Sequence, residues 1–287
     1  MRLLVVETAG GRGWRILEEA QTVTRLAEGL AETGRLGEVP AARTARVVAQ
    51  YAATAAGHGA EKLVIVATSA VREARNGGDF ARQVGALAGH PVRVVPGDAE
   101  ARLVLRGVMH GLGVTPSNLL VFDIGGGSTE FIRASGGVLQ AAVSLRLGVV
   151  QLAERFRDYA DVAQHVRARL ATEVPGQIAR PTPDHLVGTA GTVTTVAALD
   201  LGLERYDPSR VQGHRLARDA VERQLARLLP LSVAERAALP CLEPGRADVI
   251  VPGIAIVLET MTLTGAESLV VSDDGLREGI LVETLCG

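Results

Sequence analysis

The stretch Leu119-Leu-Val-Phe-Asp123-Ile-Gly-Gly-Gly-Ser-Thr-Glu130-Phe-Ile132 decides how this chain folds. Its first four residues are apolar, which is typical of a buried strand, and this strand delivers Asp123 at its end. Three glycines then let the backbone turn sharply and direct its N–H groups at an anion. The hydroxyls of Ser128 and Thr129 follow directly. This order of residues predicts a phosphate cradle.

Two acids, Asp123 and Glu130, bracket the glycine loop. Hard carboxylate oxygens beside phosphate are what Mg²⁺ prefers, because this ion keeps several waters and takes one or two protein carboxylates. We therefore expect Mg²⁺, or another divalent cation, beside the loop. The competing interpretation is a glycine-rich hairpin whose acids only cap turns.

A second candidate loop is Leu186-Val-Gly-Thr-Ala-Gly-Thr192, which leads straight into a helical pattern. Glycines before a helix N-terminus bring unbonded N–H groups and the positive end of the helix dipole to an anion. The simpler interpretation is an ordinary helix start with Thr192 as its N-cap.

Two further segments, Val66–Asn76 and Val94–Leu103, have the pattern of a strand, a turn and a helix. This pattern places Arg72 and Glu100 in the first turns of their helices. In the simpler interpretation, Glu100 complements the helix dipole and Arg72 lies on a solvated face.

Short β-branched runs alternate with helical patterns along the chain, which predicts an α/β fold with largely parallel sheets. The expected strands are 3–6, 62–67, 92–95, 119–122 and 268–271, with a hairpin of 129–133 and 138–143. The expected helices are 42–56, 79–87, 100–109, 149–156, 192–201, 217–229, 249–263 and 276–285. A Gly- and Pro-containing segment at 111–118 predicts domains 1–115 and 116–287, with a ligand cleft between them.

Composition narrows the functional classes. The 287 residues carry a formal net charge of −2, which argues against a nucleic-acid surface. The two cysteines form no metal or disulfide motif, so a reducing, cytoplasmic location is expected. The longest apolar stretch, 249–263, is too short for a membrane helix and is interrupted by Glu259. We therefore expect neither a nucleic-acid partner nor a membrane.

Seven motifs in order resemble the exopolyphosphatase and guanosine pentaphosphate phosphatase (Ppx/GppA) family. They are V-A-T-S-A-V-R-E-A-R-N, G-D-A-E-A-R-L, D-I-G-G-G-S-T-E, S-L-R-L-G, V-G-T-A-G-T, R-A-D-V-I and S-D-D-G-L-R-E-G, and the match runs from about Thr22 to the C-terminus. The resemblance implies two actin-like domains of the ribonuclease H-like type, each with a mixed five-stranded sheet. The length resembles that of short members without a C-terminal HD-type domain.

Carried over position by position, the resemblance implies that Glu100 is the catalytic base and that Asp123 and Glu130 are magnesium-site acids. Arg72 matches an arginine that contacts phosphate. The two phosphate loops match Gly125, Gly126, Gly127, Ser128, Gly188, Thr189, Gly191 and Thr192. The implied activity is exopolyphosphatase, which releases terminal orthophosphate from polyphosphate by attack of water. Guanosine pentaphosphate (pppGpp) is the alternative substrate, and a homodimer is one option for the assembly.

The pattern departs from the family in two places. Family members begin with a strand and a first phosphate loop before an R-L-L-V strand, whereas this sequence has that later strand at Arg2–Val5. The first strand of domain 1 is therefore expected to be missing, with the true start upstream; a divergent loop at Glu7–Gly13 is the alternative. Ala99 stands where relatives carry a second acid.

Two other functional classes stay open. A sensor that binds polyphosphate or a nucleotide without turnover is compatible with Ala99 and with the missing loop. A kinase of the same fold is less favoured, because no further segment suggests a site for a sugar or acyl acceptor.

Overall fold

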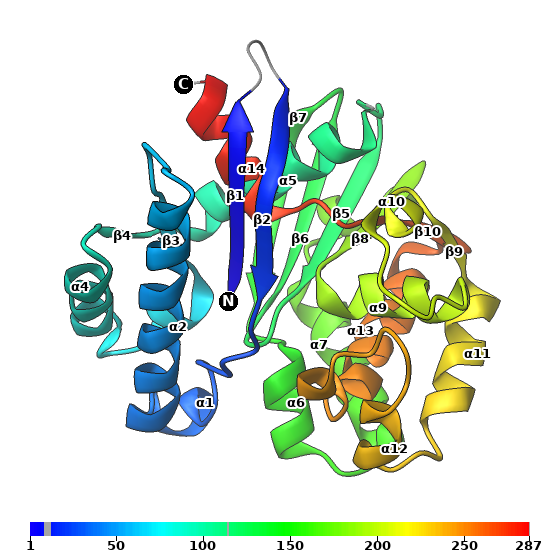
Figure 1. Ribbon diagram of the computed structural model, residues 1–287. Coiled ribbons are helices and arrows are strands. Elements are labelled where there is room, and N and C mark those ends of the chain that lie inside the picture. Colours follow the sequence, from blue (N-terminus) through cyan, green and yellow to red (C-terminus); the bar gives the residue numbers. More distant parts are fainter. Residues whose placement is uncertain (9–12, 114, 287) are drawn as a thin grey trace. The chain divides into compact units, whose positions relative to one another are not determined.

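The computed structural model describes residues 1–8, 13–113 and 115–286 and has an α/β fold (Figure 1). The chain divides into two compact units, one of Met1–Glu100 with Glu283–Gly287 and one of Ala101–Val282. Helix α5, Gly97–Leu112, crosses this division. The domain limit at residue 115 and the ligand cleft stay predictions.

The first unit holds two separate pairs of strands rather than one five-stranded sheet. An antiparallel pair joins β1 (Arg2–Thr8) to β2 (Trp14–Gln21), and a parallel pair joins β3 (Ile65–Ala67) to β4 (Val92–Val94). Its helices are α1 (Leu30–Thr33), α2 (Glu38–Gly57), α3 (Ser69–Glu73) and α4 (Gly77–Ala88). The main core of this unit lies where Val48 of α2, Val71 of α3 and Phe80 of α4 pack together.

The second unit is built on one mixed sheet of six strands in the order β7-β6-β5-β8-β10-β9. The strands are β5 (Leu119–Ile124), β6 (Thr129–Ser135), β7 (Val138–Leu145), β8 (His185–Thr189), β9 (Arg215–Ala217) and β10 (Ser268–Ser272). Strands β5, β8 and β10 are parallel. The resemblance implied five strands. The sixth is β9, which is held at the edge because its central Leu216 is fully buried.

Helices cover both faces of this sheet. The larger core packs one face, including Phe122 and Phe131, against Val193 of α9 and Ile254 of α13. The other core packs Val121, Ile132 and Val187 against α5. The remaining helices are α6 (Val149–Arg155), α7 (Tyr159–Glu173), α8 (Gly176–Ala179), α9 (Gly191–Asp200), α10 (Pro208–Val211), α11 (Arg218–Leu228), α12 (Val233–Ala237), α13 (Ile250–Thr264) and α14 (Leu276–Cys286), with a 3₁₀ turn at Pro244–Arg246. Figure 1 shows α9, α11 and α13 grouped together.

Every strand and helix expected from the pattern is present, although boundaries shift by a few residues. The strand expected at 62–67 is shorter, and the apolar stretch 249–263 forms the buried helix α13. Residues 9–12 of the alternative loop Glu7–Gly13 lie outside the described residues. Within the described part of the chain, the helices are all too short or too polar to span a bilayer.

Candidate active site

The glycine loop after β5 is held from one side by the start of α6. The backbone N–H groups of Val149 and Val150 donate to the carbonyl oxygens of Gly125 and Gly126 at 3.1 and 3.0 Å. The carbonyl and the N–H of a trans peptide point in opposite directions. The N–H groups of Gly126 and Gly127 are therefore directed away from α6, as a phosphate cradle requires.

Gly148 lies directly behind this loop. A β-carbon at Gly148 would lie 2.2 Å from the carbonyl oxygen of Gly126 and 2.4 Å from the carbonyl carbons of Gly126 and Gly127. The loop and the start of α6 can therefore approach this closely only with glycine here. Thr129 also serves this packing, because its buried hydroxyl donates to the carbonyl of Leu147 at 2.6 Å. The Thr129 hydroxyl is therefore engaged with Leu147 and serves the packing of the loop.

A row of polar residues crosses the sheet at the end of β5. Register pairs Ser144 with Glu130, Glu130 with Asp123, Asp123 with Thr189, and Thr189 with Ser272. Side chains that lie opposite each other in neighbouring strands share one face of the sheet. The face that is apolar at Val121, Ile132 and Val187 thus becomes polar at the next row.

Asp123 and Glu130 are direct cross-strand partners in this row. Opposed residues in an antiparallel pair have β-carbons about 4.5–5.5 Å apart, so one cation lies within reach of both carboxylates. Two hard oxygen donors fit Mg²⁺, which completes its shell with water, better than a transition metal that needs nitrogen or sulfur. Among the described residues, no cluster of three or more His, Cys, Asp or Glu side chains is placed to hold a metal.

The second loop joins β8 to α9 and has an unusual backbone at Ala190, whose φ is 69°. Ala190, not Thr192, is the N-cap residue, so the simpler interpretation of Thr192 is wrong in detail. Thr192 is instead buried in the first turn, where it packs against Gly253 of α13. Gly188 makes room for the ring of Phe122, since a β-carbon there would lie 2.7 Å from Cζ. Core packing alone thus accounts for this glycine, and its role in phosphate binding stays a prediction.

Arg246 brings a positive charge to the second loop, and sequence reasoning did not select it. Its guanidinium donates to the carbonyl of Gly191 at 3.2 Å, and it lies 3.4 Å from the carboxylate of Glu243. A β-carbon at Gly191 would lie 2.3 Å from the centre of the guanidinium. The motif R-A-D-V-I was the available signal, but Gly191 lies 55 positions earlier in the chain, so their contact depends on how the intervening segment folds.

In the first unit, Arg72 and Glu100 form an ion pair. The Arg72 guanidinium donates to Oε2 of Glu100 at 2.7 Å and to the carbonyl of Val95 at 2.9 Å. The Glu100 side chain is 8% exposed and that of Arg72 is 23% exposed. Glu100 lies in the first turn of α5, as the pattern predicts, whereas Arg72 lies in the last turn of the five-residue helix α3. Arg72 therefore fixes the direction of the Glu100 carboxylate.

The expected site residues thus fall into two groups, one in each unit. In the first unit, Arg72 and Glu100 form their ion pair. The second unit carries Asp123, Glu130 and both glycine loops at one end of the sheet.

The turn after β10, Ser272–Gly275, closes the same end of the sheet. The hydroxyls of Thr189 and Ser272 both donate to the carbonyl of Asp274, at 3.2 and 2.7 Å. Burial, with Glu278 nearby, raises the pKa of Asp274 to about 6, although His110 opposes the shift. The backbone carbonyl of Asp274 thus ties this turn to the ends of β8 and β10.

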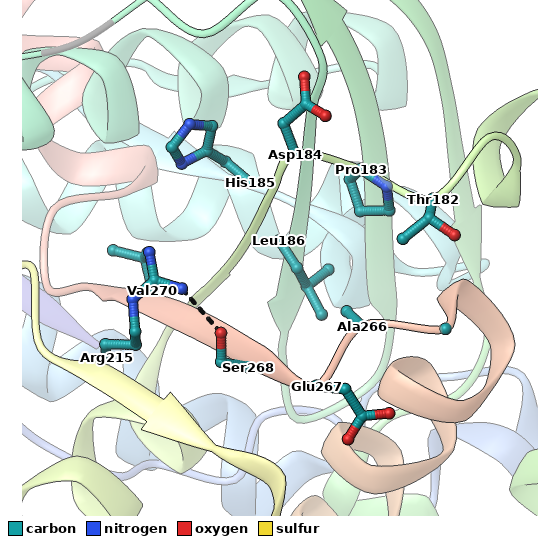
Figure 2. Close-up of a pocket in the computed structure, with 11 residues that line it drawn as sticks. Thr182, Pro183, Asp184, His185, Leu186, Arg215, Ala266, Glu267, Ser268 and Val270 are labelled. Atoms are coloured by element: carbon teal, nitrogen blue, oxygen red, sulfur yellow. Dashed lines mark hydrogen bonds between the residues drawn. The ribbon is translucent and has the colours of Figure 1, made fainter.

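A separate pocket lies at the opposite end of β8 and β10 (Figure 2). His185 and Ser268, the first residues of these strands, line it together with Arg215, which donates to the Ser268 hydroxyl at 2.8 Å. The strands are five residues long, so this pocket is at the far end from Thr189 and Ser272. It is therefore distinct from the polar row.

The fold and these loops are typical of an α/β protein that binds phosphate groups, and comparisons with known proteins give its class, a phosphatase. The model of the Ppx/GppA phosphatase family matches residues 4–286. The chain therefore belongs to the Ppx/GppA phosphatase family. It is 33% identical to exopolyphosphatase 2 of Mycobacterium tuberculosis over 304 residues, which covers 98% of this chain and 93% of the relative.

Solved structures support the same assignment. A Ppx/GppA family member from Aquifex aeolicus is 31% identical with a TM-score of 0.82, covering 99% of this chain and 94% of that chain. An exopolyphosphatase from Cytophaga hutchinsonii shares the fold with a TM-score of 0.89 at 23% identity, covering 100% of this chain and 98% of that chain.

Proposed function

We propose that the protein is an exopolyphosphatase that releases terminal orthophosphate from inorganic polyphosphate by attack of water. One observation carries the proposal: α6 anchors the carbonyls of Gly125 and Gly126, which directs two loop N–H groups outward beside the paired acids Asp123 and Glu130. An array of backbone donors next to two carboxylates suits a phosphate chain with its cation. The family membership and the curated exopolyphosphatase relative support the same substrate.

Each residue has a defined part in this reaction. The N–H groups of Gly126 and Gly127 and the second loop at Gly191 hold phosphate oxygens, and Ser128 adds a hydroxyl. Arg72 contributes positive charge beside Glu100. Glu100 orients the attacking water and accepts its proton, and the shortened polyphosphate leaves as an anion. Asp123 and Glu130 would hold Mg²⁺, which when bound polarises the terminal phosphoryl group.

Orthophosphate release from long-chain polyphosphate tests the proposal. The purified protein should release orthophosphate with Mg²⁺ present and not with a chelator. Asp123→Asn should raise the Mg²⁺ concentration for half-maximal rate by at least about 10-fold, because it removes a charged ligand. Asp161→Asn, at an exposed position in α7, is the control and should leave the titration unchanged.

The outcomes separate the competing functions. An unchanged Mg²⁺ titration in Asp123→Asn would remove Asp123 from the metal site. Binding of polyphosphate without release of phosphate would favour the sensor, for which Ala99 is the motivating feature. Parallel assays with pppGpp rank the two substrates by kcat/KM. A cytoplasmic location and a homodimer belong to the same proposal, and cell fractionation and light scattering test them.

We also propose that the fold is actin-like and that the first unit has a place for one more strand. Strands β1 and β3 belong to separate two-stranded sheets. A groove between them is lined by Met1–Leu3 and Leu63–Val66, with Val48, Tyr51 and Ala52 of α2. A strand placed in this groove would join both pairs into one five-stranded sheet and satisfy backbone groups along both of its edges.

An extension of the chain at its N-terminus tests whether the groove between β1 and β3 accepts a further strand. An added segment of alternating Val and Ile should raise the free energy of unfolding by about 2 kcal/mol or more, since two or three apolar side chains become buried. An extension of equal length made of Gly and Ser is the control. Equal stability of the two extended proteins would contradict the proposal.

A further inference from the structure

We infer that Ser144 is a positioning residue that holds the carboxylate of Glu130 for the cation, an inference that rests on the proposed function. The Ser144 hydroxyl donates to Oε1 of Glu130 at 2.7 Å. Ser144 lies near the end of β7, directly across the ladder from Glu130 in β6. It is within reach of Glu130 but is not itself a charged ligand, so it acts through the glutamate.

Glu130 needs such a partner because of its length. Its side chain has three rotatable bonds, whereas that of Asp123 has two, so its carboxylate can point in more directions from the same strand position. The residue is 4% exposed, and bulk water offers it few alternative donors. A hydrogen bond from a hydroxyl to a carboxylate is charge-assisted and directional. This bond therefore selects one orientation of the Glu130 carboxylate.

The segment that begins at Ser144 connects the proposed cation site to the glycine loop. Gly148, four positions after Ser144, packs against the glycine loop. The helix α6 starts at the next residue, and its first N–H groups donate to the loop carbonyls. The segment Ser144–Val150 thus contacts the proposed cation site at one end and the phosphate loop at the other. Because Ser144 lies in the regular ladder of β7, the sheet sets its distance from Glu130.

A cross-strand pair that only stabilises the sheet is the competing explanation. The two explanations differ in what the Ser144 hydroxyl controls. If it positions Glu130, its loss weakens cation binding without unfolding the sheet. If it only stabilises the hairpin, its loss lowers the unfolding temperature and leaves cation affinity unchanged.

Binding of Mn²⁺ alone, followed by its electron paramagnetic resonance signal without substrate, gives a readout independent of catalysis. Ser144→Ala should weaken Mn²⁺ binding about 10-fold, the usual cost of losing a hydrogen-bond partner of a metal ligand. Ser144→Thr keeps the hydroxyl and suits a strand, so it should restore affinity to within about twofold. Ser135→Ala, at the exposed end of β6, is the matched control and should bind as wild type. In steady-state assays, excess Mg²⁺ should restore the rate of Ser144→Ala, which a packing defect would not allow.

Glu130→Gln separates failure of this inference from failure of the proposed metal site. If Glu130→Gln loses Mn²⁺ affinity and Ser144→Ala keeps it, the positioning role is wrong and the metal site stands. If both variants bind Mn²⁺ as wild type does, Glu130 is not a ligand and both proposals are overturned. If Ser144→Ala and Ser144→Thr lose affinity equally, the hydroxyl is not the cause and the inference also fails.

Discussion

Replacing Glu100 by glutamine should lower kcat for phosphate release from polyphosphate by about 10²- to 10⁴-fold, the usual contribution of a general base. Glutamine has the same shape and can still contact Arg72, but it cannot accept the proton of the attacking water. Polyphosphate binding should be nearly unchanged, because the proposed phosphate contacts lie elsewhere. Phosphate release measured at saturating polyphosphate and Mg²⁺ checks this expectation.

Glu259 offers a matched control for Glu100. It is 7% exposed and forms a two-point ion pair with Arg167 at 2.9 Å, so its burial and partner resemble those of Glu100. Glu259→Gln should reduce stability and retain kcat. If Glu100→Gln and the wild-type protein release phosphate equally fast, Glu100 is not the base. If the Glu259 variant loses kcat to the same extent, the loss at Glu100 reflects folding rather than chemistry.

Replacing Gly148 by alanine should lower kcat/KM by about 100-fold, the size expected when a catalytic group moves by about 1 Å. Gly148 has φ −106° and ψ 153°, a conformation that alanine adopts readily. The effect therefore comes from contact alone, since the new β-carbon would lie 2.2 Å from the carbonyl oxygen of Gly126. The loop or α6 must shift, and the free energy of unfolding should fall by about 1–3 kcal/mol, as for other overpacked sites.

Gly176→Ala is the control for this substitution. A β-carbon there would meet no atom within 4 Å, and the residue begins α8 in the same unit. Its kinetics and stability should match those of the wild-type protein. Unfolding in urea and steady-state kinetics measured on both variants give the comparison. Wild-type kcat/KM in Gly148→Ala would show that the loop position does not govern activity.

Several elements could be predicted because their signals are local. Strand β5 is apolar and buried except at Asp123, and α13 is an apolar segment long enough for a helix. Other elements carried weak signals. Strand β2, Trp14–Gln21, has no fully buried residue and is held by its pairing with β1 and by Leu17 and Ala20, which pack on a small core. Helix α7 presents apolar residues at every fourth position, Val162, Val166 and Leu170, between polar ones, and was not predicted.

The candidate site likewise has a part that the local sequence predicts and a part that only the folded structure shows. The glycine loop, Asp123 and Glu130 lie within a dozen residues of one another, and a hairpin register brings the two acids opposite each other. The contacts that hold these residues come from further along the chain. Ser144, Gly148 and Arg246 lie in the motifs S-L-R-L-G and R-A-D-V-I, but what each residue does is seen only from what it touches.

The sequence by itself determined the α/β class, the order of the main strands and helices, and the residue types of the two glycine loops. These features follow from the spacing of hydrophobic residues and from the conformational freedom of glycine, and both act over a few neighbouring residues. Only the tertiary structure decided which way the loop N–H groups point, which side chains hold Glu130 and Glu100, and why Gly148 and Gly188 are glycines. Those features depend on contacts between segments far apart in the chain, and close packing, not local preference, sets them.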